Sequence, residues 1–127
     1  PTLRFSKWKV AVRTEDKYYV ATVFKGEITI LDVFDRHPIP DSPILNAAKK
    51  DKNLAAFVSF SPIYRFEITE GEHAHEVKFI DLRYRSNGHY PFVAVVRLNG
   101  ELEIINSYTG WIFSDEKLNK KLKVITQ

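Results

Sequence analysis

Apolar and polar side chains alternate through most of the chain, with β-branched and aromatic residues at many apolar positions. Successive side chains of a strand point to opposite faces, so this period predicts strands that bury one face. The predicted strands, about seven in number, cover residues 5–13, 17–24, 27–34, 56–69 in one or two pieces, 75–85, 91–98 and 101–113.

Helix signals interrupt the strand pattern at two places. Ser42 as an N-cap before Pro43 predicts a helix that ends near residue 51, and Ser114 before Asp115 and Glu116 predicts a second one. We therefore predict an α+β fold with a mainly antiparallel sheet and two short helices. The alternative is an all-β, partly closed barrel.

Two dipeptides between predicted strands favour tight turns. Asn99-Gly100 is the stronger type I′ signal and Lys25-Gly26 the weaker one. The segment 19–28 also resembles the segment 92–102, each with similar strands around it. This similarity suggests two βββα pseudo-repeats.

The predicted strand 75–85 changes phase within its length. Val77 and Phe79 lie on one face, whereas Ile80 and Leu82 lie on the other. A β-bulge near Phe79-Ile80 would bring all of them to the core, and we predict that bulge. The next strand is apolar at consecutive positions, which indicates a central strand with both faces buried.

Length and composition indicate one folded domain. With 127 residues, 44% hydrophobic and 28% charged, the chain is predicted to form a single soluble domain over residues 1–127. The absence of Cys excludes disulfides and thiolate metal sites. A start without Met predicts that the chain is a fragment of a longer protein.

The positive charge lies at the two ends of the chain. The formal net charge is +3, but the residues between the basic termini carry a net negative charge. We therefore expect no nucleic-acid partner. A basic N-terminal flank is typical of a cytoplasmic segment beside a transmembrane helix.

A row of charged residues, Asp81, Arg83 and Arg85, is the strongest candidate site. On a buried strand such a row must be paired or must line a pocket. We predict that Asp81 accepts a hydrogen bond from Arg83 or Arg65 and that the remaining guanidinium faces a concave surface. The candidate ligand-binding residues are Arg65, Asp81, Arg83, Arg85, His89, Tyr108 and Trp111.

Other chemistry-bearing residues carry weaker signals. His73 and His75 could bind a metal on one side of a strand, but their acidic surroundings are typical of a solvated turn. Asp32 and Asp35 fall on opposite faces, which disfavours paired acid–base catalysis. We predict no catalytic residue and no metal ligand in this chain.

Several segments together resemble a known family. The runs FIDLRYRS at 79–86, HYPFVA at 89–94, SYTGW at 107–111, FSPIYR at 60–65 and FDR at 34–36 are similar to the C-terminal extramembrane domain of bacterial membrane-bound, inner-membrane metal-dependent hydrolases.

This resemblance implies a soluble accessory, regulatory or ligand-binding domain on the cytoplasmic face of the inner membrane. It implies no cofactor here and a divalent metal in an N-terminal region outside this chain, which would contact the membrane. A protein or an anionic ligand is the expected partner. The alternative is that the domain is itself a hydrolase with a pocket around Asp81, Arg83, His89 and Tyr108.

Overall fold

The computed structural model describes residues 7–112, and the chain divides into two compact units. Unit 1 ends at Pro38 and unit 2 begins at Ile39, so each is described by itself. The helix predicted after Ser114 lies outside the described residues. Within them the chain forms strands and two short helices, which confirms the α+β class.

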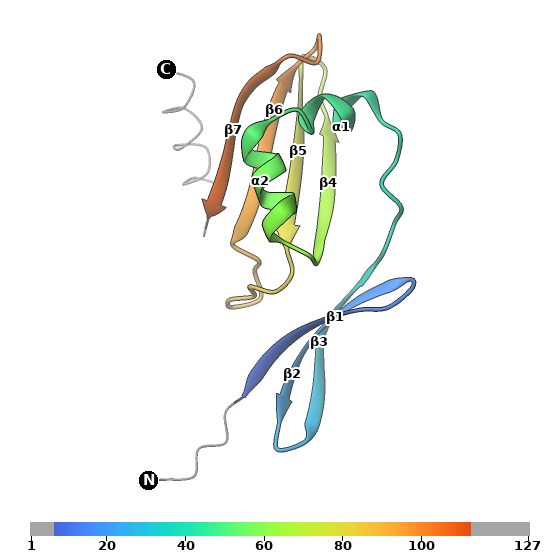
Figure 1. The fold of residues 1–127 in the computed structure, drawn as a ribbon, viewed down its shortest axis with the longest axis vertical. Helices are drawn as coiled ribbons and strands as arrows, with labels where there is room; N and C mark the ends of the chain where they lie inside the picture. The colour runs from blue at the N-terminus through green and yellow to red at the C-terminus, as the bar shows by residue number, and fades with distance from the viewer. Residues whose placement is uncertain (1–6, 113–127) are drawn as a thin grey trace. The chain divides into compact units, whose positions relative to one another are not determined.

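Unit 1 is an antiparallel meander of three strands, β1 (Trp8–Arg13), β2 (Lys17–Phe24) and β3 (Glu27–Asp35) (Figure 1). Lys25 and Gly26, with φ of 50° and 79°, form the turn between β2 and β3. Two consecutive positive φ values match a type I′ turn, whose twist suits a hairpin. The weaker of the two predicted turn signals is therefore correct.

Unit 2 packs two helices against one face of a four-stranded antiparallel sheet (Figure 1). The sheet order is β4-β5-β6-β7. Its elements are α1 (Pro43–Ala48), α2 (Lys52–Phe60), β4 (Tyr64–Glu70), β5 (Ala74–Asp81), β6 (Phe92–Asn99) and β7 (Ile104–Trp111). The described strands form open sheets, so the alternative of a partly closed barrel is wrong.

The helix α2 replaces the first part of the strand predicted over 56–69. Asp51 caps it, because its carboxylate accepts a hydrogen bond from the N–H of Leu54 at 3.1 Å. Leu54 and Phe57 are buried one turn apart, which is helical spacing. Ser42 caps the shorter α1 as predicted, accepting from the N–H of Leu45 at 3.3 Å.

The core of unit 2 forms between the helices and the sheet. Phe57 of α2 packs edge-on against Phe79 at 6.4 Å between ring centroids and stacks on Phe92 at 5.6 Å. Val93 and Val95 of β6 are buried on the other face of the sheet. The prediction of a central strand with both faces buried is therefore confirmed.

The predicted bulge at Phe79-Ile80 is wrong. The register of β5 continues without a shift against both β4 and β6. Phe79 is buried toward the helices and Ile80 is buried on the opposite face. Apolar residues therefore occur on both faces of β5, and no bulge is needed to explain the change of phase. The strand ends at Asp81, earlier than predicted, and the Leu82 N–H donates to the Ile63 carbonyl at 3.1 Å.

The hairpin between β6 and β7 forms, but its turn is longer than predicted. The residue with positive φ is Leu102 (63°) rather than Asn99 or Gly100. The Asn99 side chain accepts hydrogen bonds from the N–H groups of Glu101 and Glu103, both at 2.9 Å. Asn99 therefore stabilises a wider loop from its side chain, as Asn often does in turns.

Candidate functional site

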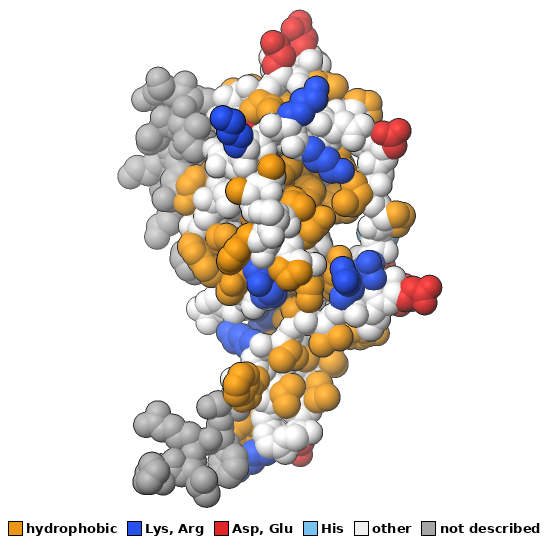
Figure 2. Space-filling view, in the orientation of Figure 1, with side chains coloured by type: hydrophobic (Ala, Val, Ile, Leu, Met, Phe, Trp, Pro, Cys, Tyr) orange, Lys and Arg blue, Asp and Glu red, His pale blue; other side chains and the backbone are white. Residues whose placement is uncertain are grey.

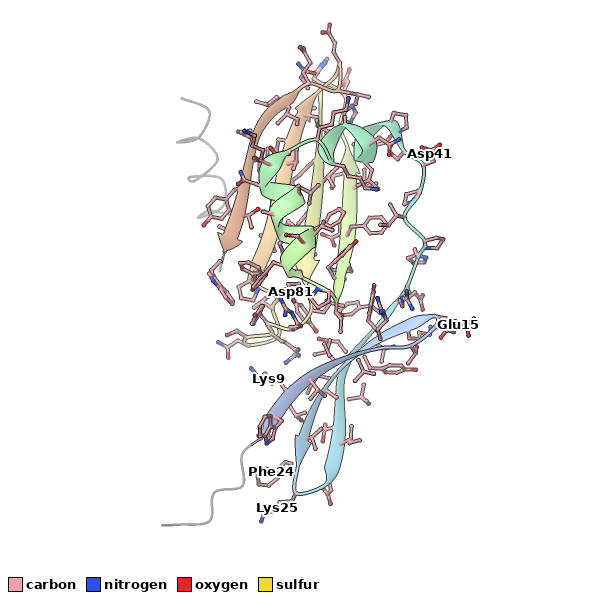
Figure 3. The ribbon with its side chains drawn as sticks, in the orientation of Figure 1. Lys9, Glu15, Phe24, Lys25, Asp41 and Asp81 are labelled. Carbon is pink, nitrogen blue, oxygen red and sulfur yellow. The ribbon has the colours of Figure 1, made fainter. Side chains whose placement is uncertain are left out.

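Asp81, the last residue of β5, is the centre of the candidate site (Figure 3). Its side chain is fully buried. The hydroxyl of Ser61, just after α2, donates to Oδ2 at 2.6 Å, and the backbone N–H of Arg83 donates to Oδ1 at 2.9 Å. The carboxylate thus ties the end of α2 to the end of β5.

The Arg83 guanidinium completes the shell around this carboxylate. Nε lies 3.1 and 3.2 Å from the two Asp81 oxygens, and Nη2 lies 2.8 Å from Oδ2. The hydrogen bond to Asp81 raises the pKa of Arg83, so the side chain stays cationic. The predicted Asp81–Arg83 pair is confirmed. Both oxygens of the Asp81 carboxylate accept hydrogen bonds from Ser61 and Arg83.

Arg83 also forms the edge of an aromatic surface. Its Cζ lies 5.0 Å from the ring centroid of Phe60 and 5.1 Å from that of Tyr84, both within cation–π range. Tyr84 contacts Phe92 at 5.7 Å and Trp111 at 5.0 Å, and Phe92 contacts Trp111 at 4.9 Å. We call these five residues the aromatic surface.

The rings of the aromatic surface lie at or just beyond the ends of helices and strands. Phe60 is the last residue of α2, Phe92 the first of β6 and Trp111 the last of β7, while Tyr84 follows β5. Phe92 faces Trp111 across the β6–β7 ladder. Phe60 remains 56% exposed and Trp111 47% exposed, so large apolar rings point to solvent beside a fixed cation.

Two other predicted site residues lie on the opposite face of the sheet. Arg65 faces Ile80 across the ladder, one position out of phase with Asp81, and its Nη2 contacts Glu67 at 3.1 Å. Tyr108 pairs with Val95 and covers Gly110. Asp81 therefore takes Arg83, not Arg65, as its partner, because strand alternation separates the two arginines.

Arg85 and His89 belong to the loop between β5 and β6. The N–H and C=O groups of Ser86 and His89 bond to each other at 2.8 and 2.9 Å. Asn87 and Gly88 form the tight turn between them with positive φ. Of the predicted set, the structure brings Asp81, Arg83 and Trp111 to one end of the helix-covered face. The wider ligand-binding set stays a prediction.

The structure does not bring together the four residues of the predicted hydrolase pocket. Ser61 and Arg83 already donate hydrogen bonds to the Asp81 carboxylate, and Tyr108 lies on the opposite face of the sheet. The predicted pocket around Asp81, Arg83, His89 and Tyr108 therefore does not form. Across residues 7–112, no cluster of three or more His, Cys, Asp or Glu side chains could hold a metal. His73 is exposed at the β4–β5 turn.

Sequence reasoning missed four participants: Phe60, Ser61, Tyr84 and Phe92. Only the helical state of 52–60 places Phe60 at the end of an element rather than inside a strand. The signal that could have revealed it is the Asp51 cap followed by apolar residues at helical spacing.

The chain thus forms two compact units, the second with helices on one face of an antiparallel sheet. Residues 43–122 match the family model of the YfhP C-terminal alpha/beta plait domain, and residues 1–34 match that of the YfhP middle domain. The chain therefore belongs to the YfhP family.

An uncharacterized protein YfhP of Bacillus subtilis (strain 168) is 54% identical over 124 residues. The match covers 98% of this chain and 38% of that relative, so this chain spans well under half of the relative's length. No solved structure matches the chain significantly.

These comparisons correct the resemblance to membrane-bound metal-dependent hydrolases. The matching models and the relative are all YfhP, and no such hydrolase family is indicated. The accessory role in a hydrolase, the metal-dependent parent and the inner-membrane localisation rested on that resemblance and are withdrawn with it. Among the helices of residues 7–112, none is long and apolar enough to cross a membrane.

Proposed function

We propose that unit 2 is a protein-binding domain that contacts an apolar segment of its partner through the aromatic surface. The observation that carries this proposal is the exposure of Phe60 and Trp111 at the two ends of one connected set of rings. Exposed apolar rings that form one contiguous patch are typical of interaction sites, whereas single exposed rings are common on any protein surface.

The composition of the surface supports a protein partner. Trp, Tyr and Arg are the residues most enriched among those that dominate binding energy at protein interfaces. Trp111, Tyr84 and Arg83 are contiguous here through ring and cation–π contacts. Aromatic side chains also have few rotatable bonds, so ordering them on binding costs little entropy.

The state of Arg83 favours an apolar partner over an anionic one. Its guanidinium already makes a two-pronged contact with Asp81, so the local charge is largely neutralised. An incoming phosphate or carboxylate would compete with a buried carboxylate two residues away. The same contact holds the planar group in place, which reduces the cost of using its exposed edge for binding.

Site-specific photocrosslinking tests this proposal. p-Benzoylphenylalanine replaces Phe60 in one chain and Val58 in the control, since Val58 is also exposed on α2. In native cells we expect a discrete crosslinked protein from position 60 and none from position 58. Trp111→Ala or Arg83→Ala in the same chain should remove that product.

The purified partner gives the quantitative check. Each single alanine variant of Trp111 or Arg83 should weaken its affinity by roughly tenfold or more, the range expected for dominant interface residues. Equal crosslinking from positions 58 and 60, or affinities that these variants leave unchanged, would contradict the proposal.

A further inference from the structure

The three-stranded sheet of unit 1 has one face that is apolar except for its last row, where Lys17 pairs with Asp35. The register brings three rows of three side chains to this face, which we call the apolar face. The rows consist of Trp8, Val23 and Ile28, then Val10, Ala21 and Ile30, then Val12, Tyr19 and Val33. Lys9, Arg13, Glu27 and Asp32 lie on the other face.

Much of the apolar face is exposed to solvent. Five of its nine side chains, Trp8, Val12, Ile28, Ile30 and Val33, are between 47% and 67% exposed. Figure 2 shows hydrophobic side chains gathered on the surface of this sheet. Contiguous apolar patches of several hundred Å² often mark interaction sites.

The described part of unit 1, residues 7–38, forms one sheet without a second layer of its own. A folded domain normally buries a sheet face against another layer, and units below about 40 residues usually need a disulfide, a metal or an oligomeric partner. The chain has no Cys. In the described range 7–112 no group of three or more His, Cys, Asp or Glu side chains could hold a metal. Burial of the apolar face in an interface would therefore stabilise unit 1.

We propose that the apolar face docks against the apolar face of a second copy of this chain. Two such faces match in chemistry, because the charged row of each, Lys17 and Asp35, is already paired within its own copy and leaves no charge for the other to neutralise. Antiparallel sheets pack face to face about 10 Å apart with aligned strands, which gives a two-fold symmetric sandwich.

The size of the face suits a weak but specific pair. Taking about 250 Å² for Trp and about 150 Å² for Val or Ile, the exposed fractions amount to roughly 500 Å² per copy. Two copies would bury about 1,000 Å², near the lower bound for a specific interface. Ala21, in the middle of the face, is already buried, so the contact would be made by the larger exposed side chains around it.

The apolar face lies on a different unit from the aromatic surface, so a test of one does not decide the other. Sedimentation equilibrium of the 127-residue chain between roughly 10 µM and 1 mM tests it. We expect a monomer–dimer equilibrium in this range. In a Trp111→Phe background, Trp8 is the one remaining Trp, and its fluorescence should shift to shorter wavelength as the dimer forms.

Two variants on one strand provide the matched comparison. Ile28→Lys places an ammonium group on the apolar face and should weaken dimerisation at least tenfold, because the charge would be buried without a partner. Thr29→Lys adds the same charge to the opposite face, where Thr29 is exposed, and should leave dimerisation unchanged. Trp8→Arg is a second disrupting variant on β1.

Amide chemical shifts of β1–β3 verify that each variant keeps the sheet. A wild-type chain that stays monomeric to 1 mM overturns the proposal, including the case in which another part of a longer family chain covers the face. Dimerisation that Ile28→Lys and Trp8→Arg leave unchanged, or that Thr29→Lys weakens equally, overturns it as well.

Discussion

Arg83 folds back onto Asp81, two residues earlier, so that one carboxylate receives both the backbone N–H and the guanidinium of the same residue. This local arrangement closes the end of β5, since a carboxylate that bonds the second N–H after it forms a compact turn. It also fixes the cation that borders the aromatic surface.

Replacing Asp81 by Asn should destabilise unit 2. The variant leaves Ser61 and Arg83 without their carboxylate. Removing one partner of a buried pair costs about 3–5 kcal/mol, and the 31% exposure of Arg83 reduces this to about 2–3 kcal/mol. Urea unfolding of both proteins measures the difference.

The control for Asp81→Asn is Glu67→Gln, which removes the exposed partner of Arg65. Exposed pairs contribute little, so a change below about 0.5 kcal/mol is expected there. A loss equally small for Asp81→Asn would show that the carboxylate does not organise this end of the sheet.

Phe57 and Phe60 should respond very differently to truncation. Phe57→Ala removes a buried ring that contacts Tyr64, Phe79 and Phe92, at a cost of about 3–5 kcal/mol. Phe60→Ala, on the same helix but mostly exposed, should cost less than about 1 kcal/mol. Thermal unfolding of the two variants measures this difference.

Gly110 is predicted to be intolerant of a side chain. A Cβ there would lie 2.6 Å from the Tyr108 hydroxyl oxygen and 3.0 Å from Cζ of the same ring. Gly110→Ala should therefore cost about 2 kcal/mol. Gly26→Ala, where nothing lies within 4 Å and only the positive φ resists, should cost about 1 kcal/mol.

A double variant separates the steric effect at Gly110 from backbone strain. If the Tyr108 ring is the obstacle, Gly110→Ala should cost clearly less in a Tyr108→Ala background, as a double-mutant cycle would measure. Strict additivity of the two substitutions would instead assign the cost to the backbone.

The Lys17–Asp35 pair should make unit 1 sensitive to acid. The hydrogen bond and charge of Lys17 lower the pKa of Asp35 below its ordinary value of 3.8. A carboxylate with a lowered pKa in the folded state stabilises that state above the unfolded pKa, and the contribution is lost as pH falls through the folded pKa.

A carboxyl-carbon NMR titration checks this directly. In wild type the Asp35 resonance should titrate below pH 3.8, and Lys17→Gln should move its midpoint upward. The stability difference between the two proteins should shrink as the pH falls from 6 toward 2, which spans about 4 pH units around that pKa. Identical Asp35 titrations in both proteins would refute the role of the pair.

Local features of the amino-acid sequence determined much of the secondary structure. The β2, β3 and β6 strands, the Ser42 cap and the burial of β6 on both faces follow from alternation, turn residues and capping chemistry. These depend on neighbours within a few positions, so they can be recognised without knowing the fold.

Tertiary contacts decided the remaining features. Residues 56–60 have side chains that suit strand and helix alike, and the packing of Leu54 and Phe57 on the sheet selects the helix. The choice of Arg83 over Arg65 as the partner of Asp81 follows from where β5 ends and which sheet face each arginine occupies.

The two proposed surfaces depend on both levels. Alternation in β1, β2 and β3 determines which residues share a face, but strand pairing decides that nine apolar side chains align as three rows. The aromatic surface joins residues from positions 60 to 111 that meet only at one end of the folded sheet. Contacts between residues so far apart in the sequence depend on how whole helices and strands pack. The local sequence does not specify which ends of these elements lie together.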